Sequence, residues 1–157
     1  MATVEIDKPV PDFAAQATSN KDIVLSMLQG WNVVLYFYPK DNTPGCTTES
    51  LDFKEFYKDF LDAKTLIFGV SKDTLKSHEQ FKSEQGLPFE LISDTDAYLC
   101  RMFEVIQLIN MYGKQIPGVE RSTFLIDSKG VLRREWRKVR VNGHVEEVLE
   151  AAEALNQ

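Results

Sequence analysis

Residues 39–46 read Pro-Lys-Asp-Asn-Thr-Pro-Gly-Cys and place a thiol where it could act as a nucleophile. They follow an apolar run rich in β-branched and aromatic residues, Val33–Tyr38, and precede a long helical pattern. Cys46 is therefore expected where a strand passes into a helix. A free thiol is mostly protonated at neutral pH, and the positive end of a helix stabilises the thiolate. We interpret Cys46 as a reactive cysteine rather than an inert, buried one.

The spacing of Pro39, Thr43 and Cys46 resembles the active-site motif of the peroxiredoxins. The longer version, Thr-Pro-Gly-Cys-Thr-Thr-Glu, resembles the bacterioferritin-comigratory or peroxiredoxin Q branch of the AhpC/TSA superfamily. Later segments resemble the same family, so that the resemblance spans nearly the whole chain. They are Gly69-Val70-Ser71, Ser77-His78-Glu79, Gly86-Leu87-Pro88-Phe89, Ile92-Ser93-Asp94 and Arg121-Ser122-Thr123-Phe124-Leu125-Ile126-Asp127.

The resemblance implies a thiol-dependent peroxidase that reduces hydrogen peroxide and organic hydroperoxides through a sulfenic acid on Cys46. The Thr43 hydroxyl and the backbone amides near Gly45 and Cys46 would hold the peroxide, and Pro39 would close one wall of its site. By the same resemblance Arg121 would stabilise the developing charge. Spacing alone does not show that Arg121 meets Cys46, because the two residues lie far apart in the sequence.

Glu49 lies one helical turn beyond Cys46. In the family that the chain resembles, a glutamate at this place belongs to the hydrogen-bond network that holds the active-site arginines. We therefore expect Glu49 to support Arg121.

The chain departs from many members of this branch, which carry a second cysteine five residues after the first. Here that position is Leu51. Two routes of reduction remain open: an outside thiol (thioredoxin, glutaredoxin or glutathione) reduces Cys46, or Cys100 acts as the resolving cysteine. We favour the first, because Cys100 lies in an apolar helical segment typical of a core, and a disulfide needs Cα atoms within roughly 7 Å.

Two other functions compete with the peroxidase. The first is a redox sensor or chaperone-like protein in which oxidation of Cys46 changes binding partners instead of clearing peroxide. The second, a thioredoxin-like disulfide reductase, is disfavoured because the chain has no Cys-x-x-Cys sequence.

Length and composition limit the number of domains, the cellular location and the partners that can be expected. The 157 residues fit one domain, and the net charge of −6 opposes binding to nucleic acid. No apolar stretch approaches the ~20 residues of a membrane helix, and no export signal is visible, so the cytoplasm is expected.

The two histidines lack metal-ligand spacing, and we expect neither metal nor cofactor. A basic cluster is interpreted as a solvated face; it comprises Arg133, Arg134, Arg137, Lys138 and Arg140.

The patterns predict an α/β protein of thioredoxin-like fold, with a central mixed sheet flanked by helices and a single domain over residues 1–157. The thioredoxin label comes from the resemblance. Strands are expected at 4–6, 23–25, 33–38, 66–70, 90–92, 122–127 and 131–139, and helices at 47–61, 74–85, 96–103 and 144–155. The stretch 105–119 is expected to be irregular. A monomer is expected, with the alternative that apolar residues mark a contact surface; these are Ile106, Leu108, Ile109 and Met111.

Overall fold

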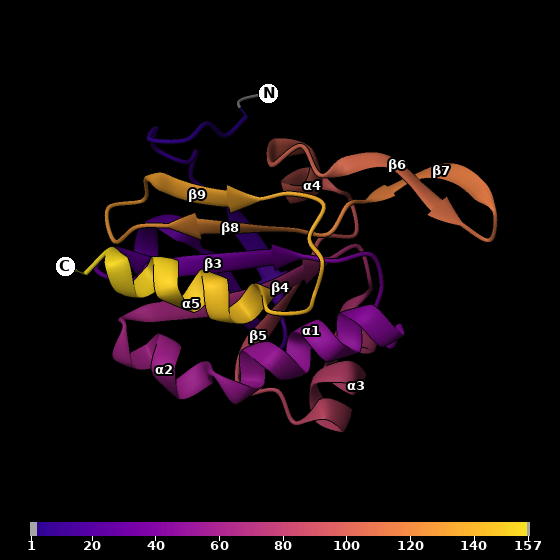
Figure 1. The fold of residues 1–157 in the computed structure, drawn as a ribbon, viewed down its shortest axis with the longest axis horizontal. Coiled ribbons are helices and arrows are strands. Elements are labelled where there is room, and N and C mark those ends of the chain that lie inside the picture. Colours follow the sequence, from indigo (N-terminus) through magenta and orange to yellow (C-terminus); the bar gives the residue numbers. More distant parts are fainter. Residues whose placement is uncertain (1–2, 157) are drawn as a thin grey trace.

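The structure, a computed structural model, describes residues 3–156, without the side chain of Met111. Residues 1, 2 and 157 of the predicted single domain therefore lie outside the described residues. The described chain forms a seven-stranded sheet of order β2-β1-β5-β4-β3-β8-β9 and a separate hairpin of β6 and β7 (Figure 1). The strands are Ala14–Ala17 (β1), Lys21–Val24 (β2), Asn32–Phe37 (β3), Thr65–Ser71 (β4), Glu90–Ser93 (β5), Ile106–Met111 (β6), Lys114–Val119 (β7), Ser122–Ile126 (β8) and Leu132–Trp136 (β9).

Strand β3 lies inside the sheet, parallel to β4 and antiparallel to β8, so the sheet is mixed as the sequence predicted. Every residue of β3 is buried. Successive side chains of a strand point to opposite faces, and accordingly Val33 and Phe37 lie in one core cluster whereas Tyr36 lies in another. Burial on both faces explains why the segment reads as a continuous apolar run.

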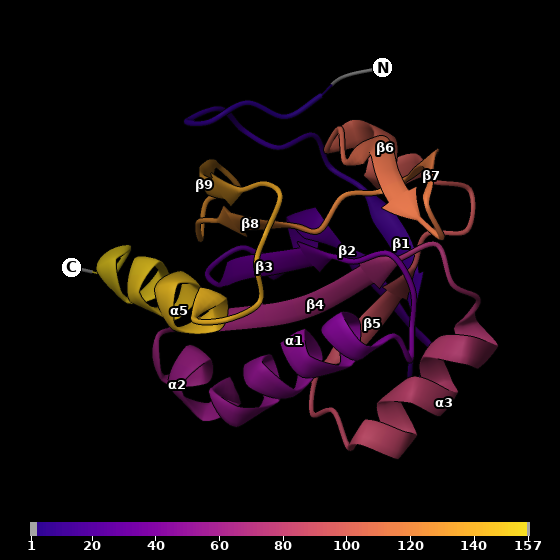
Figure 2. The ribbon, with the colours of Figure 1, turned by 45° about the vertical axis from the view of Figure 1, so that its right-hand side comes forward.

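Helices cover the two faces of the sheet unequally. Figure 2 shows α1, α2, α3 and α5 on one side, where Phe53, Phe81 and Val148 share a core cluster. Helix α4 contributes Leu99 to the other cluster. None of the described helices is long and apolar enough to cross a membrane. The helices are Pro44–Glu55 (α1), Tyr57–Asp62 (α2), Leu75–Gln85 (α3), Tyr98–Met102 (α4) and His144–Ala154 (α5), with a 3-10 turn at Leu25–Leu28.

Most predicted elements are confirmed, with the following exceptions. Residues 4–6 form no strand, because the chain turns there and Asp7 takes a left-handed φ of 66°. The helix expected at 47–61 begins earlier and is divided at Phe56, which lies between α1 and α2 with φ −97° and ψ 9°. Strand β1 was missed because its sequence, Ala-Ala-Gln-Ala, contains no β-branched or aromatic residue.

The stretch 105–119 is not irregular but contains the β6–β7 hairpin. Tyr112 and Gly113 form its turn with φ values of 52° and 77°, the positive values that a two-residue hairpin loop favours. The hairpin projects from the body of the protein (Figure 1), and Leu108 is 66% exposed on it. Of the other apolar residues named above, Ile106 and Ile109 are half-buried, and the side chain of Met111 lies outside the description.

Candidate active site

Cys46 lies where the sequence places it, between a buried strand and a helix. Strand β3 ends at Phe37, and α1 begins at Pro44 with Thr43 as its N-cap. Cys46 therefore occupies the first turn of α1, whose backbone amides lack intrahelical partners. Its side chain is 1% exposed. The sulfur thus lies at the positive end of the helix, shielded from bulk water.

Arg121 joins the sulfur to a buried carboxylate. It lies between β7 and β8, and its Nη2 donates to Cys46 Sγ at 3.3 Å while Nη1 donates to Glu49 Oε1 at 2.8 Å. Although burial lowers the pKa of Arg121, the charges and hydrogen bonds of Glu49 and Cys46 raise it above its ordinary value. The guanidinium thus carries a permanent positive charge at the sulfur, with two of its nitrogens held in a fixed orientation.

Gly45 gives the guanidinium the room to approach. A Cβ atom built on Gly45 would lie only 3.1 Å from Arg121 Nη2. Any other residue at this position would press on the nitrogen that donates to Cys46. The Pro-Gly-Cys sequence therefore has a steric reason beyond the turn itself.

Glu49 is fully buried on α1, and burial raises its pKa to about 7 although the Arg121 guanidinium opposes this rise. Its Oε2 has no hydrogen-bond partner among the described residues and lies 3.9 Å from His144 Nε2. That nitrogen shares a hydrogen bond of 2.8 Å with Thr123 Oγ1. Burial, and then the charge of Arg121, lower the pKa of His144 to about 4. His144 is thus neutral beside Glu49 at neutral pH.

Thr43 and Pro39 belong to the loop between β3 and α1, and both are half-buried. The Thr43 hydroxyl donates to the Lys40 carbonyl oxygen at 2.8 Å. Because this bond uses its only proton, the hydroxyl can act toward a ligand only as an acceptor, which suits the O–H of a peroxide.

Cys100 does not join this constellation. It is fully buried on α4 in the core cluster on the other face of the sheet, whereas Cys46 belongs to the cluster beneath α1. Both cysteines are free thiols. Burial, followed by the charge of Asp94, raises the pKa of Cys100 well above the ordinary thiol value. Cys100 therefore has the surroundings of a packed core thiol.

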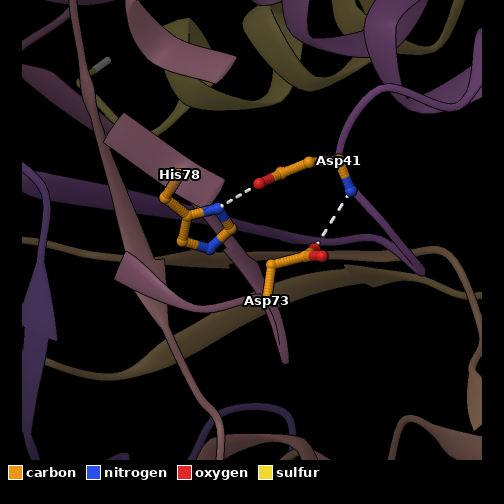
Figure 3. Close-up of side chains that lie close together, drawn as sticks. All are labelled: Asp41, Asp73 and His78. Carbon is orange, nitrogen blue, oxygen red and sulfur yellow. Dashed lines mark hydrogen bonds and ion pairs between the residues drawn. The ribbon is translucent and has the colours of Figure 1, made fainter. Parts of the chain in front are cut away.

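A buried polar network next to the motif was missed by the sequence analysis. Asp41, Asp73 and His78 place potential metal-ligand atoms within 4.8 Å of one another (Figure 3). His78 Nδ1, however, lies 2.7 Å from Asp41 Oδ2, and Nε2 lies 2.9 Å from the Ile92 carbonyl oxygen. A carbonyl oxygen only accepts, so Nε2 carries a proton, and Nδ1 shares one with Asp41. Both ring nitrogens are thus engaged in hydrogen bonds within the protein.

Hydrogen bonding also determines the charge of Asp41. Burial raises its pKa, but the hydrogen bond and charge of His78, with further bonds from Tyr38 and Ser77, outweigh burial and lower the pKa below its ordinary value. The sequence signal for this network was present, since Asp41 stands inside the motif and His78 in one of the resembling segments. In the sequence the two histidines were interpreted only as possible metal ligands, and not as hydrogen-bond partners.

Comparisons with known proteins agree on one family. The AhpC/TSA family model matches residues 6–135. Peroxiredoxin Bcp of Xanthomonas campestris is 46% identical over 153 residues, covering 98% of this chain and 96% of that protein. Peroxiredoxin Bcp of Bacillus subtilis is 43% identical over 155 residues, covering 99% of each.

Solved structures lead to the same branch. The X. campestris peroxiredoxin Q structure has a TM-score of 0.88 at 46% identity and covers 98% of this chain and 97% of that one. A structure of the bacterioferritin comigratory protein of the same organism, described with its alkyl peroxide reduction activity, has a TM-score of 0.89 at 44% identity and covers all of both chains. These neighbours confirm the expected thioredoxin-like fold.

Proposed function

The chain belongs to the AhpC/TSA family as a peroxiredoxin of the Bcp or Q branch, a thiol peroxidase, and we propose that Cys46 is its peroxidatic nucleophile and passes through a sulfenic acid. The substrates proposed are hydrogen peroxide and organic hydroperoxides. Alkyl peroxide reduction is described for the X. campestris bacterioferritin comigratory protein, and the similarity of the two chains carries that substrate class to this one as a proposal.

The proposed step is a two-electron oxidation of sulfur. An electron pair of the Cys46 thiolate attacks one peroxide oxygen, the O–O bond breaks, and the leaving oxygen departs as hydroxide or alkoxide. One proton then gives water or an alcohol. The oxygen that remains on sulfur forms the sulfenic acid, Cys–SOH.

The observation that carries this proposal is the contact of Arg121 with both Cys46 and Glu49. A cation 3.3 Å from the sulfur stabilises the thiolate before the reaction, and its charge lies beside the oxygens that become negative as the bond breaks. Thr43, an acceptor, is proposed to orient the peroxide O–H, with the amides of Gly45 and Cys46 as donors. Pro39 is proposed to close one wall, and Glu49 to orient Arg121.

We infer that the enzyme works with one cysteine and that an external thiol (thioredoxin, glutaredoxin or glutathione) restores it. The thiol would attack the sulfenic sulfur and release water, and a second thiol would release Cys46 from the mixed disulfide. Leu51 replaces the helix-internal partner cysteine, and Cys100 belongs to the core cluster on the opposite face of the sheet. The proposal extends to a monomer in the cytoplasm, where such thiols are kept reduced.

The test is the intact mass of the protein after one equivalent of hydrogen peroxide, with and without a sulfenic-acid trap. The expected product is a trapped adduct on Cys46, which Cys46→Ser abolishes and Cys100→Ser leaves unchanged. Loss of two hydrogens from a single chain would instead make Cys100 the resolving cysteine. Efficient trapping with slow turnover by every reductant would favour the redox sensor, and an unchanged mass would refute the peroxidase chemistry.

A further inference from the structure

Asp41 anchors the loop that carries Pro39 and Thr43. Its carboxylate accepts hydrogen bonds from Tyr38 Oη at 2.7 Å, Ser77 Oγ at 2.8 Å and His78 Nδ1 at 2.7 Å. We propose that Asp41 and His78 are a positioning pair that fixes the shape of the peroxide site from behind the loop. This inference rests on the proposed peroxidase function, for which neither residue has been given a part so far.

The place of Asp41 in the loop makes it a suitable anchor. It lies two residues after Pro39 and two before Thr43, the residues proposed to shape and orient the peroxide. Its backbone N–H donates to Asp73 Oδ2 at 3.0 Å, so the main chain is held as well as the side chain. Asn42 follows with a left-handed φ of 63°, which sets the course of the chain into Thr43. A shift of Asp41 would therefore move both neighbours in the peroxide site.

His78 in turn connects this anchor to the sheet and to α3. The ring is fully buried, and its Nε2 donates to the carbonyl oxygen of Ile92, the residue that pairs with Val70 in the sheet. Its Nδ1 faces Asp41, as Figure 3 shows. Both ring nitrogens are thus fixed, Nε2 by the sheet and Nδ1 by the loop residue Asp41. The imidazole of His78 therefore connects the sheet to the loop directly.

The two ring nitrogens can be tested separately. In His78→Asn the amide nitrogen can replace Nδ1 and keep the bond to Asp41, while the bond to Ile92 is lost. In His78→Gln the amide nitrogen can replace Nε2 and keep the bond to Ile92, while Asp41 loses the histidine bond, one of its three side-chain hydrogen bonds. Lys76→Ala, at an exposed position of α3, is the control for a change on the same helix.

Two rates of Cys46 modification are measured for each variant by mass spectrometry: sulfenic acid formation by hydrogen peroxide and alkylation by iodoacetamide. Alkylation requires the thiolate but not a site shaped for peroxide. His78→Gln is expected to slow the peroxide reaction by about ten- to a hundredfold, because misplacement by about 1 Å can cost that much, and to leave alkylation within about twofold. His78→Asn should stay within about threefold of the native peroxide rate.

Equal peroxide rates in the Asn and Gln variants, or a parallel fall of both reactions, would overturn the positioning role, since a merely structural histidine predicts such results. If the His78 variants do not fold, Tyr38→Phe removes one bond to Asp41 and should slow only the peroxide reaction. A native protein that alkylates at Cys46 but never reacts with peroxide would refute the proposed function itself. That result is distinguishable, because it appears before any variant is compared.

Discussion

Replacing Glu49 or His144 by glutamine should give two opposite dependences of stability on pH, where the native protein shows little dependence. Both residues are buried, at 0% and 5% exposure, and their facing atoms, Glu49 Oε2 and His144 Nε2, lie 3.9 Å apart. Both side chains favour the neutral form: Glu49 keeps its proton up to about pH 7, and His144 takes up a second proton only near pH 4. Each substitution exposes the effect of the residue that remains.

The signs follow from proton binding in the two states. Burial raises the pKa of Glu49 from 4.5 to about 7, so the native state binds more protons in that range and its stability falls as the pH rises from 4.5 to 7. The pKa of His144 is lowered from 6.5 to about 4, so the unfolded state binds more protons and stability falls as the pH decreases from 6.5 to 4. Each difference corresponds to about 3 kcal/mol, at about 1.4 kcal/mol per pKa unit. The two effects oppose and largely offset each other where the ranges overlap.

Urea unfolding of the reduced protein between about pH 4 and pH 8 provides the assay. Circular dichroism is the better signal, because the Trp136 ring packs against His144 and its fluorescence would respond to the substitution directly. Glu49→Gln should gain stability as the pH rises to 6.5, and His144→Gln should lose stability as it rises to 7, each by about 3 kcal/mol of a total of about 5–15.

Glu55→Gln, an exposed change on the same helix, should follow the native profile. A native-like profile in either buried variant would refute the prediction, because the shifted pKa values of Glu49 and His144 would then not determine the pH dependence. A double variant with both substitutions should again be nearly independent of pH.

Three further predictions test the surroundings of the site. Gly45→Ala should slow sulfenic acid formation about tenfold with an unchanged circular dichroism spectrum, because the new Cβ would lie 3.1 Å from Arg121 Nη2; an unchanged rate would contradict this steric role. Leu51→Cys should replace the trapped sulfenic acid by a disulfide with Cys46, seen as a loss of two hydrogens after peroxide, with the turn of α1 between the two positions unwinding to let the sulfurs meet; continued trapping would contradict it. Gly86→Ala should lower the free energy of unfolding by about 1 kcal/mol, because Gly86 ends α3 with a φ of 61°, while the peroxide rate stays the same.

The sequence could predict the elements whose periodicity is produced by burial. Strand β3 was predicted because its burial on both faces produces a continuous apolar run. Helix α3 was predicted together with its end, because Gly86 is the residue type that adopts a left-handed C-cap. The β6–β7 hairpin could not be found in this way: it projects from the body, so burial imposes no clear alternation on it. Its signal was instead the Tyr112-Gly113 turn.

In the active site, residues close together in the sequence could be predicted, whereas contacts between distant segments could not. Cys46, Thr43 and Gly45 lie in one continuous motif, so their types and spacing were visible together. The contact of Arg121 with Cys46 depends on β8 lying antiparallel beside β3, a pairing that no local pattern records. Family resemblance supplied the contact that spacing could not. The bond between Asp41 and His78 was not predicted, because the residues lie far apart in the sequence and no local pattern joins them.

The arrangement of the sheet also favours one route for the reduction of oxidised Cys46. Alternation along β3 sends its side chains into two cores, and the two thiols follow this division: Cys46 lies in the core with α1, and Cys100 in the core with α4. A disulfide between them requires Cα atoms within roughly 7 Å, whereas the packed sheet separates their helices. Joining the two sulfurs would therefore require at least one helix to leave its core and lose the burial that holds it. An external thiol demands no such rearrangement of the sheet, and for this reason we expect Cys100→Ser to complete the cycle as the native protein does.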